Sequence, residues 1–443
     1  MSAVRKIAVI GAGWAGCTAA VELARSGQNV TLFESARTLG GRARRVEFDG
    51  RSLDNGQHIL LGAYRETLRL LKLVGVDAER AFLRLPLQMS YPPGSGGMDF
   101  RAPRLPAPLH LVTALLRATG LQGADKMALA RFSSTARWMD WRLNVDCTVA
   151  HLLERWDQTP RIIQLMWRPL CIAALNTPPE RASAQVFLKV LQDSLGARRA
   201  ASDMLLPRVD LSAVFPDQAA AYLRRNRGTV LEGVTVQSIS AAGSGWRIAS
   251  DGDLVTEFDG VVIATQAKQA GRLLAGLEAI TEPEFEYEPI TTCYLQYAPS
   301  LRLTRPFFAL LDDAALGHWG QFVFDRGQLD AAQAGMLAVV VSTSSQATEL
   351  GHDALATALA QQIAAALHMP ELAAPLWRQV ISEKRATFAC TPGLARPANA
   401  TALSSVVLAG DYTASEYPAT LETAVRSGVE AARLILVGSP GKP

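Results

Sequence analysis

The chain is poor in charged residues and contains no basic tract. Charged residues make up 19% of its 443 residues, and the formal net charge is only +3. Proteins that bind nucleic acid through its phosphates gather Lys and Arg on one surface. We therefore expect no nucleic acid partner. Hydrophobic residues make up 49%, which excludes a largely disordered chain.

Cysteine and histidine are also scarce. The scattered cysteines form no C-x-x-C pair and are Cys17, Cys147, Cys171, Cys293 and Cys390. An odd number at these spacings predicts neither a disulfide framework nor a zinc site. The six histidines show no metal-ligand spacing either. We expect reduced thiols and no metal ion.

Long apolar runs are missing as well. A membrane-spanning helix needs about 18 or more consecutive apolar residues, and no such run occurs. The first predicted strand starts at residue 7, which leaves no room for a secretory signal peptide. We therefore expect a cytoplasmic protein. The mean hydropathy of +0.11 is nevertheless high for a freely soluble enzyme.

The strongest motif lies near the N-terminus. An apolar run at 7–10, which predicts a buried parallel strand, leads directly into Gly11, Gly13 and Gly16 in G-x-G-x-x-G spacing. The glycines permit a tight turn, a close approach to a pyrophosphate and close helix packing, in that order. Glu34 ends the next predicted strand, where a carboxylate holds ribose hydroxyls. The motif predicts a dinucleotide site; the alternative is a glycine-rich turn without a ligand.

The residues after Glu34 indicate which dinucleotide binds. Leu39, Gly40, Gly41 and Arg42 follow it after a short spacer. This pattern resembles the flavin amine oxidase and carotenoid desaturase superfamily. The resemblance implies FAD, with Arg42 near the pyrophosphate. It also implies an α/β fold, in which a Rossmann-type FAD-binding domain carries an inserted substrate domain of helices plus a mixed or antiparallel sheet.

The same resemblance assigns further residues to FAD. They are Gly56, Gln57, His58, Val236, Gly410, Asp411, Thr420 and Leu421. In the superfamily the first three pass the flavin ring, Val236 matches a backbone partner of adenine, and the Gly-Asp pair meets the pyrophosphate and ribityl chain. The helix that starts near Thr420 would present amides to the flavin N1–O2 edge. A helix N-terminus suits the negative charge of that edge in reduced flavin.

The chain is too long for one hydrophobic core. We expect residues 1–75, 216–275 and 395–443 to form the FAD-binding domain. Residues 76–215 and 276–394 would form the substrate domain.

The expected elements follow from hydrophobic periodicity. Residues 46–53 predict one strand, and the inserted region predicts helices at 109–117, 126–141, 149–156, 160–174 and 182–195. Further strands are expected at 291–298, 318–325 and 336–343. The insert is rich in tryptophan, namely Trp138, Trp141, Trp156 and Trp167. These residues suit either a core or a pocket for a long apolar substrate.

Longer strings resemble a particular subfamily. Residues 53–64, 167–178, 203–207 and 384–388 are similar to the hydroxysqualene dehydroxylase family, flavoenzymes of bacterial hopanoid biosynthesis. The resemblance implies reductive dehydroxylation of hydroxysqualene to squalene. In that reaction an acid protonates the allylic hydroxyl and reduced flavin supplies a hydride.

The sequence offers several proton donors. Our candidates are Asp54, His58, Asp193, Asp203 and Asp210. Asp203 and Asp210 flank an apolar segment just before the chain returns to the predicted FAD domain, which would place them over the flavin. The competing interpretation of each acid is a helix cap or a turn residue. For His58 it is a polar residue that caps its turn.

Three other functions remain open. A carotenoid-type desaturase or a flavin amine oxidase would share the fold and FAD, and a non-catalytic isoprenoid carrier would keep FAD for stability. Many amine oxidases bind flavin through cysteine, but the context of Cys390 matches theirs poorly. The sequence contains no second G-x-G-x-x-G, so it leaves the electron donor open, as well as the oligomeric state.

One predicted helix suits a membrane surface. Its apolar residues are Leu109, Leu111, Val112, Leu115 and Leu116, and the flanking cations are Arg101, Arg104 and Arg117. Apolar side chains in the acyl boundary with arginines at the phosphates are typical of a monotopic helix. A peripheral site on the inner face of the cell membrane is therefore one expectation. The alternative is that this helix packs inside the substrate domain.

Overall fold

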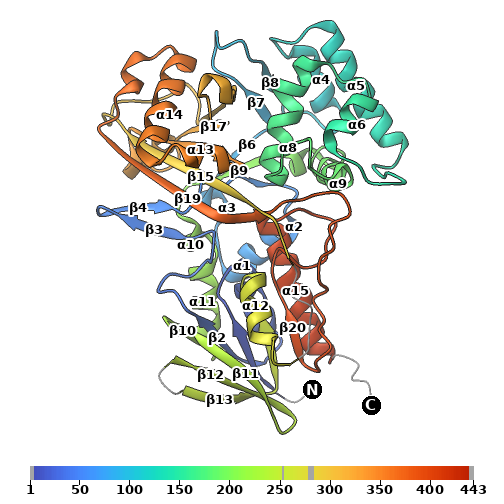
Figure 1. Cartoon of the computed structure of the whole chain (residues 1–443), viewed down its shortest axis with the longest axis vertical. Helices are drawn as coiled ribbons and strands as arrows, with labels where there is room; N and C mark the ends of the chain where they lie inside the picture. The colour runs from blue at the N-terminus through green and yellow to red at the C-terminus, as the bar shows by residue number, and fades with distance from the viewer. Residues whose placement is uncertain (1–3, 252–253, 278–283, 439–443) are drawn as a thin grey trace.

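The computed structural model describes residues 4–251, 254–277 and 284–438. Figure 1 shows two bodies stacked along the long axis, with both termini at the lower end. The lower body contains a parallel sheet, and the upper body contains an antiparallel sheet and a group of helices. The predicted fold class is thereby confirmed. The exact domain boundaries stay a prediction.

The parallel sheet gathers strands from three distant parts of the chain. Its strands, in spatial order, are β10 (Thr229–Glu232), β2 (Asn29–Glu34), β1 (Lys6–Ile10), β14 (Gly260–Ile263) and β20 (Val406–Leu408). The central strands are almost completely buried, as expected for a sheet covered on both faces. The carboxyl ends of all five strands therefore share one edge.

Helices cover one face of this sheet. α1 (Trp14–Arg25) lies between α11 (Pro216–Arg225) and α15 (Leu421–Val437). On the other face, β1 and β14 contact an antiparallel sheet made of β11 (Val236–Ala242), β12 (Gly245–Ser250) and β13 (Leu254–Phe258), with α12 (Ala267–Leu274) against β11. The first and last helices of the chain thus pack side by side.

The prediction of a single strand at 46–53 is wrong. The segment forms a hairpin of β3 (Arg45–Phe48) and β4 (Arg51–Asp54). Asp49 and Gly50 make its turn, with φ values of 50° and 71°. An Asp-Gly pair takes these left-handed angles readily and is a common two-residue hairpin turn.

The upper sheet is antiparallel throughout. Its strands, in spatial order, are β16 (Phe307–Ala309), β17 (Phe322–Asp325), β18 (Met336–Ser342), β15 (Tyr287–Gln296) and β19 (Trp377–Phe388). α13 (Ser345–Glu349) and α14 (His352–Leu367) pack on it. A small sheet links the N-terminal segment to the insert through β5 (Leu60–Leu61), β9 (Met204–Pro207) and β6 (Phe82–Leu85).

The remaining elements lie mostly in the insert. They are α2 (Arg65–Val74), α3 (Ala78–Ala81), β7 (Gln88–Ser90), β8 (Asp99–Arg101), α4 (Leu109–Arg117), α5 (Gly123–Trp138), α6 (Val149–Arg155), α7 (Pro160–Ile162), η1 (Ile163–Trp167), α8 (Arg168–Leu175), α9 (Ala184–Ser194), η2 (Arg199–Ser202) and α10 (Leu211–Val214). The helix predicted at 126–141 begins and ends three residues earlier. Within the described residues, no helix has the length and apolar character that crossing a bilayer requires.

The helix predicted at 160–174 changes its winding in the middle. Residues 163–167 form a π-turn just before Pro169. Proline has no N–H to donate to the carbonyl four residues earlier, which belongs to Leu165. The hydroxyl of Tyr91 donates to that carbonyl instead, at 2.9 Å. The helix therefore continues past Pro169 with a local rewinding before it.

The four tryptophans of the insert have different environments. Trp156 and Trp167 are buried and pack around Phe132, with ring centroids 4.8 and 4.2 Å from it. Trp138 is 87% exposed. Trp141 is 9% exposed and lines a cavity. Trp156 therefore belongs to the core, whereas Trp141 lines a cavity and Trp167 both packs on Phe132 and lines a second, smaller cavity.

Candidate cofactor site and the cavity beside it

The glycine-rich turn at the end of β1 leaves space for a ligand at the start of α1. Gly11 has φ +99°, and a Cβ there would lie 2.7 Å from the carbonyl oxygen of Ala264. A Cβ on Gly16 would lie 1.8 Å from the Gly11 carbonyl oxygen, so only glycine lets α1 pack this closely. A Cβ on Gly13 would meet nothing nearer than Gly41 Cα, at 3.9 Å. Open space therefore lies over the start of α1.

The start of α1 is prepared for an anion. Its N-cap residue, Gly13, has no side chain to accept from the first amides, and the first turn contains no acidic residue. The first amides of a helix have no intrahelical partner and carry a partial positive charge. A phosphate placed there would accept their hydrogen bonds.

Glu34 is fixed next to the glycine turn. Its Oε2 accepts from the Ala12 N–H at 2.7 Å, and its Oε1 accepts from the Ala36 N–H at 2.9 Å. The Glu34 carbonyl accepts from the Val234 N–H at 2.9 Å. Val236 begins β11 two residues later. The structure thus brings the predicted ribose and adenine residues to the same end of the sheet.

Arg42 joins three segments that are far apart in the sequence. Gly40 and Gly41 adopt positive φ, and the Gly40 N–H donates to the Ala12 carbonyl at 2.9 Å. Arg42 Nη2 then donates to Asp411 Oδ1 at 2.6 Å, and its Nη1 donates to the Ala386 carbonyl at 2.7 Å. Burial opposes the charge, yet Asp411 raises the pKa of the Arg42 guanidinium. This cluster fixes a cation beside the glycine turn.

The C-terminal segment completes this part of the site. Gly410 follows β20, and its N–H donates to Ser427 Oγ at 2.9 Å. Thr420 caps α15 by accepting from the Thr423 N–H, so α15 begins at Leu421. The Tyr412 hydroxyl is buried and has no hydrogen-bond partner within the described residues. A buried hydroxyl without a partner is costly, and this one lies in the segment that the superfamily uses for the pyrophosphate.

The turn from Gly56 to His58 lies against the upper sheet. The Gln57 N–H donates to Thr292 Oγ1 at 3.3 Å, and Gln57 Oε1 accepts from Arg326 Nη1 at 2.8 Å. His58 Nδ1 lies 2.7 Å from the Gly56 carbonyl oxygen, and burial lowers the pKa of this imidazole. His58 is therefore mostly neutral at neutral pH, and the bond to Gly56 suits its interpretation as a capping residue.

Asp54 is a buried carboxyl at the end of β4. Its Oδ1 accepts from the Leu211 N–H at 2.8 Å, and its main-chain carbonyl accepts from the Tyr294 hydroxyl at 2.9 Å. Burial raises the pKa of Asp54 to about 6, against an opposing effect of Arg326. Roughly a tenth of this carboxyl is therefore protonated at pH 7.

The other candidate acids have structural partners. Asp203 is buried, with Oδ2 accepting from Arg84 Nε at 2.7 Å and Oδ1 accepting from Arg199 Nη1 at 2.9 Å. Asp210 caps α10 and lies 3.1 Å from an Arg45 nitrogen. These contacts favour the interpretation of both as structural residues. Their predicted catalytic role stays untested.

Asp193 is also engaged. It accepts from the Tyr417 hydroxyl and lies 3.6 Å from the Lys189 ammonium. It therefore links α9 to the loop that precedes α15.

Sequence reasoning missed Arg396, whose partners are main-chain atoms. Its guanidinium donates to the carbonyls of Asp411 and Tyr417, each at 2.7 Å, and lies 4.8 Å from the ring centroid of Phe388. Arg396 thereby holds the loop between β20 and α15. Carbonyl groups are present at every residue, so no sequence pattern identifies such partners.

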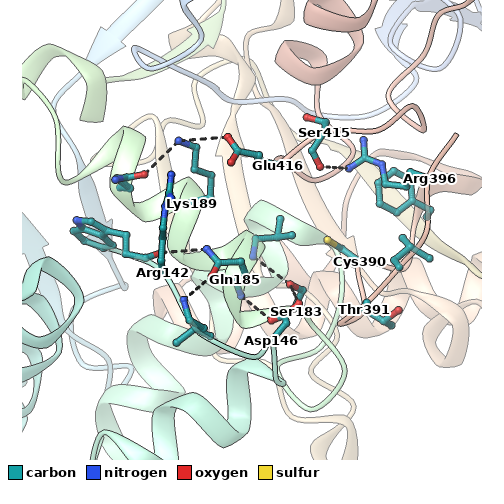
Figure 2. A pocket seen from close by; sticks show the side chains of 17 residues that line it. Arg142, Asp146, Ser183, Gln185, Lys189, Cys390, Thr391, Arg396, Ser415 and Glu416 are labelled. Carbon is teal, nitrogen blue, oxygen red and sulfur yellow. Dashed lines mark hydrogen bonds and ion pairs between the residues drawn. The ribbon is translucent and has the colours of Figure 1, made fainter. Parts of the chain in front are cut away.

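A cavity of about 370 Å³ lies beside this loop. Figure 2 shows Gln185 and Lys189 of α9 on one side and Cys390 and Arg396 on the other. Trp141, Val186 and Phe388 add apolar surface. Burial raises the pKa of the Cys390 thiol to about 12, so the thiol stays protonated and is a poor nucleophile.

The residues present fit FAD. The open space at Gly13 and the free amides of α1 suit the pyrophosphate, and Glu34 suits a ribose. Arg42 supplies a nearby cation, and the unpartnered Tyr412 hydroxyl supplies a donor. These groups come from both ends of the chain.

Comparisons with known proteins agree with this geometry. The family model described as "Flavin containing amine oxidoreductase" matches residues 14–436. The chain is 29% identical to hydroxysqualene dehydroxylase of Rhodopseudomonas palustris and 26% identical to that of Sinorhizobium fredii, in both cases over 98% of each chain. It is also 22% identical to the chloroplastic/chromoplastic zeta-carotene desaturase of Arabidopsis thaliana, over 97% of this chain and 85% of the relative.

Solved structures show the same fold. A putative protoporphyrinogen oxidase from Exiguobacterium is similar with a TM-score of 0.68 and 16% identity, over 99% of this chain and 100% of the other. A putrescine oxidase bound to putrescine gives a TM-score of 0.68 and 16% identity, over 98% and 99%. At this level of identity the likeness concerns the fold alone.

Proposed function

This chain belongs to the flavin containing amine oxidoreductase family, and on that premise we propose that it reduces hydroxysqualene to squalene. It is an FAD-dependent oxidoreductase. The observation that carries the proposed reaction is the set of relatives named hydroxysqualene dehydroxylase. They match at least 97% of this chain and 98% of their own lengths, at 26–29% identity.

The reaction replaces an allylic hydroxyl by hydrogen. When bound, reduced FAD supplies the hydride. Hydroxide is a poor leaving group, so the chain must supply an acid that protonates it. Among the candidates Asp54, His58, Asp203 and Asp210, we place Asp54 first. Its pKa of about 6 keeps part of the Asp54 carboxyl protonated at neutral pH. A general acid works best when its pKa lies near the working pH.

The remaining candidates are less suited to this step. Both carboxyl oxygens of Asp203 accept from guanidinium groups, and the carboxylate of Asp210 contacts Arg45 and caps α10. His58 has a lowered pKa because of its burial, so little of it carries a second proton. These three residues would then hold the chain segments around the active site in place.

The lipid origin of the substrate supports a membrane site. A thirty-carbon isoprenoid partitions into bilayers, so the enzyme must collect it there or from a carrier. α4 exposes Leu109, Val112 and Leu116 in a stripe at helical spacing, and the exposed Leu105 precedes the helix. Figure 1 places α4 at the end of the molecule opposite the termini. We include in the proposal that this stripe docks on anionic lipid, with Arg101, Arg104 and Arg117 at the headgroups.

Anaerobic single-turnover chemistry tests the reaction. Photoreduced enzyme mixed with hydroxysqualene should yield one squalene for each flavin reoxidised. Asp54→Asn should slow this reoxidation by roughly 10²–10⁴-fold, the usual scale for general acid catalysis, and Asp203→Asn at equal flavin content serves as the comparison. A larger loss in Asp203→Asn would move the acid there.

The desaturase relatives define the rival outcome. They cover 97% of this chain at 22–23% identity, so a carotenoid-type desaturase is the second candidate. Oxidised enzyme that introduces double bonds into phytoene, with no squalene formed by the reduced enzyme, would overturn the proposal in favour of the desaturase.

A further inference from the structure

A second, smaller cavity lies among α4, α5 and α9. It measures about 30 Å³, and Leu111 of α4, Phe132 of α5 and Leu191 of α9 contribute to its lining. Trp141 lines this cavity and also the larger one of about 370 Å³. Trp141 is therefore a lining residue that both cavities share.

The backbone of Trp141 is held in an unusual conformation. Its φ is +57°, and that of the preceding Asp140 is +50°, a region that bulky L-residues rarely adopt. The Trp141 N–H donates to the Ala136 carbonyl at 2.8 Å, and its own carbonyl accepts from Gln185 Nε2 at 3.1 Å. Hydrogen bonds thus fix both main-chain groups of Trp141.

Close packing also fixes the ring itself. A Cβ built on Gly196 would lie 3.3 Å from Trp141 Cζ2. Glycine at this position therefore allows the edge of the indole to pack against the backbone. The ring is 9% exposed. Main-chain hydrogen bonds and the backbone at Gly196 thus restrict the position of the indole of Trp141, which lines both cavities.

We propose that the two cavities are parts of one channel for the isoprenoid chain, and that Trp141 is the wall that sets the chain length the channel accepts. This inference rests on the proposed function. The larger cavity is near the lower limit of ligand pockets, which span roughly 300–1,000 Å³. A thirty-carbon chain would therefore extend past Trp141 into the smaller cavity, whose lining is mostly apolar but includes Ser133 and Arg137.

The ends of the channel agree with this assignment. The small cavity is reached from α4, because Leu111 lines it while its neighbours Leu109 and Val112 point outward and are about half exposed. The large cavity ends at Ser415 and Glu416, in the loop just before α15, the helix that the resemblance assigns to the flavin ring. An apolar chain would thus enter beside the exposed stripe of α4, and the end of the chain that enters first would reach the flavin.

Equilibrium dialysis of FAD-loaded, oxidised enzyme tests the channel without turnover. The probes are a C15 isoprenoid (farnesol), a C30 isoprenoid (squalene) and a C40 isoprenoid (phytoene) in detergent micelles, quantified by gas chromatography. Leu111→Trp fills the small cavity and should weaken squalene binding at least tenfold, while farnesol binding changes less than twofold. Trp141→Ala removes the wall and should raise the ratio of phytoene to squalene affinity at least tenfold.

Matched controls separate these effects from altered folding. Trp138→Ala removes an indole that is 87% exposed, and Met127→Trp adds one at a site that is 70% exposed. Neither should change any affinity, and all variants should keep the flavin content and melting temperature of the wild type. If Trp141→Ala does not fold, Trp141→Phe should shift the phytoene to squalene ratio in the same direction by a smaller factor.

The outcomes distinguish the channel from the reaction. Equal weakening of farnesol and squalene by Leu111→Trp, or an unchanged phytoene to squalene ratio in both Trp141 variants, overturns the channel. The predicted pattern together with no squalene formed from hydroxysqualene supports the channel and overturns the reaction. A wild-type enzyme that retains none of the three isoprenoids overturns both.

Discussion

At the scale of single residues, the cofactor site contains polar groups whose burial has an energetic cost. Asp54 is 3% exposed and Tyr412 is 4% exposed. One is a carboxyl with a raised pKa and the other a hydroxyl without a partner. Such groups are unfavourable for folding. We therefore expect Asp54 to make stability depend on pH, and Tyr412 to affect FAD binding.

Asp54 should make stability depend on pH. Burial raises its pKa from 3.8 to about 6. A carboxyl with a higher pKa in the folded state contributes stability below the unfolded pKa, and this contribution is lost as pH rises through the folded pKa. The shift is worth ~3 kcal/mol. The free energy of unfolding of the wild type, relative to Asp54→Asn, should fall by up to this amount between pH 4 and pH 7.5.

Denaturant titrations of both proteins at the two pH values check this prediction. The comparison with Asp54→Asn cancels the other titrating groups, because asparagine keeps an oxygen for the Leu211 N–H. A difference between the two proteins that does not change with pH would contradict the raised pKa.

Tyr412→Phe should separate folding from FAD binding. The hydroxyl has no partner within the described residues, so its removal should leave the stability of the apoprotein unchanged or slightly higher. If the hydroxyl donates to bound FAD, its loss should weaken FAD binding by ~1 kcal/mol, or roughly fivefold. Fluorescence titration of apoprotein with FAD measures this, and equal affinities would show that the hydroxyl faces away from the cofactor.

At the scale of elements, the packing of the first helix on the last one brings both ends of the chain to the cofactor. A Cβ on Gly428 of α15 would lie 2.3 Å from the Ala15 carbonyl oxygen of α1 and 2.8 Å from Thr18 Cβ. The two helices therefore touch nearly backbone to backbone at this point.

Gly428→Ala should push α15 away from α1. Overpacking of this kind costs about 1–3 kcal/mol, and FAD affinity should fall with it because both helices start at the cofactor site. Gly123→Ala is the control, since a Cβ there meets nothing within 4 Å. Thermal melts and flavin content measure both effects. Wild-type values for Gly428→Ala would show that the helices separate without cost.

The helix α4 should determine membrane binding. Leu109, Val112 and Leu116 are 55%, 49% and 70% exposed, whereas Leu111 and Leu115 are only partly exposed. The change of the first three residues to serine should therefore reduce co-sedimentation with anionic liposomes severalfold and leave flavin content and melting temperature intact.

A matched triple variant controls for the general loss of apolar surface. Leu316, Leu350 and Leu376 are 67%, 46% and 76% exposed and lie in the upper sheet region, away from α4. Their change to serine should leave liposome binding unaltered. If both triple variants sediment like the wild type, α4 does not dock on lipid.

At the scale of the whole molecule, FAD should act as part of the structure. Its predicted contacts come from the first 60 residues, from Val236 and from the last 35 residues, so binding links distant segments. A ligand at a hundred times its dissociation constant stabilises the folded state by ~2.7 kcal/mol. Removal of FAD should lower the melting temperature accordingly, and its return should restore it.

Riboflavin is the control for this experiment. It has the flavin ring but neither the pyrophosphate nor the adenosine that the glycine turn and Glu34 suit. At the same concentration it should give a much smaller rise in melting temperature. Equal rises would mean that the glycine turn contributes little to binding.

The sequence by itself determined the local features of this protein. The glycine turn after β1, the buried strands and most helices of the insert follow from neighbouring residues, because backbone geometry and periodic burial are encoded within a few turns or a single strand. The helices at α4, α6 and α9 end within two residues of their predicted bounds. The hairpin at Asp49 and Gly50 was also encoded locally, by a turn signal that the single-strand interpretation passed over.

Only the tertiary structure decided which distant groups meet. Arg42 and Asp411 are 369 residues apart in the sequence, and the carbonyl partners of Arg396 have no sequence signature. Likewise, composition left open which tryptophan packs in the core and which lines a cavity. The physical reason is that these roles depend on burial and on the register between segments, and both are set only when the whole chain has packed.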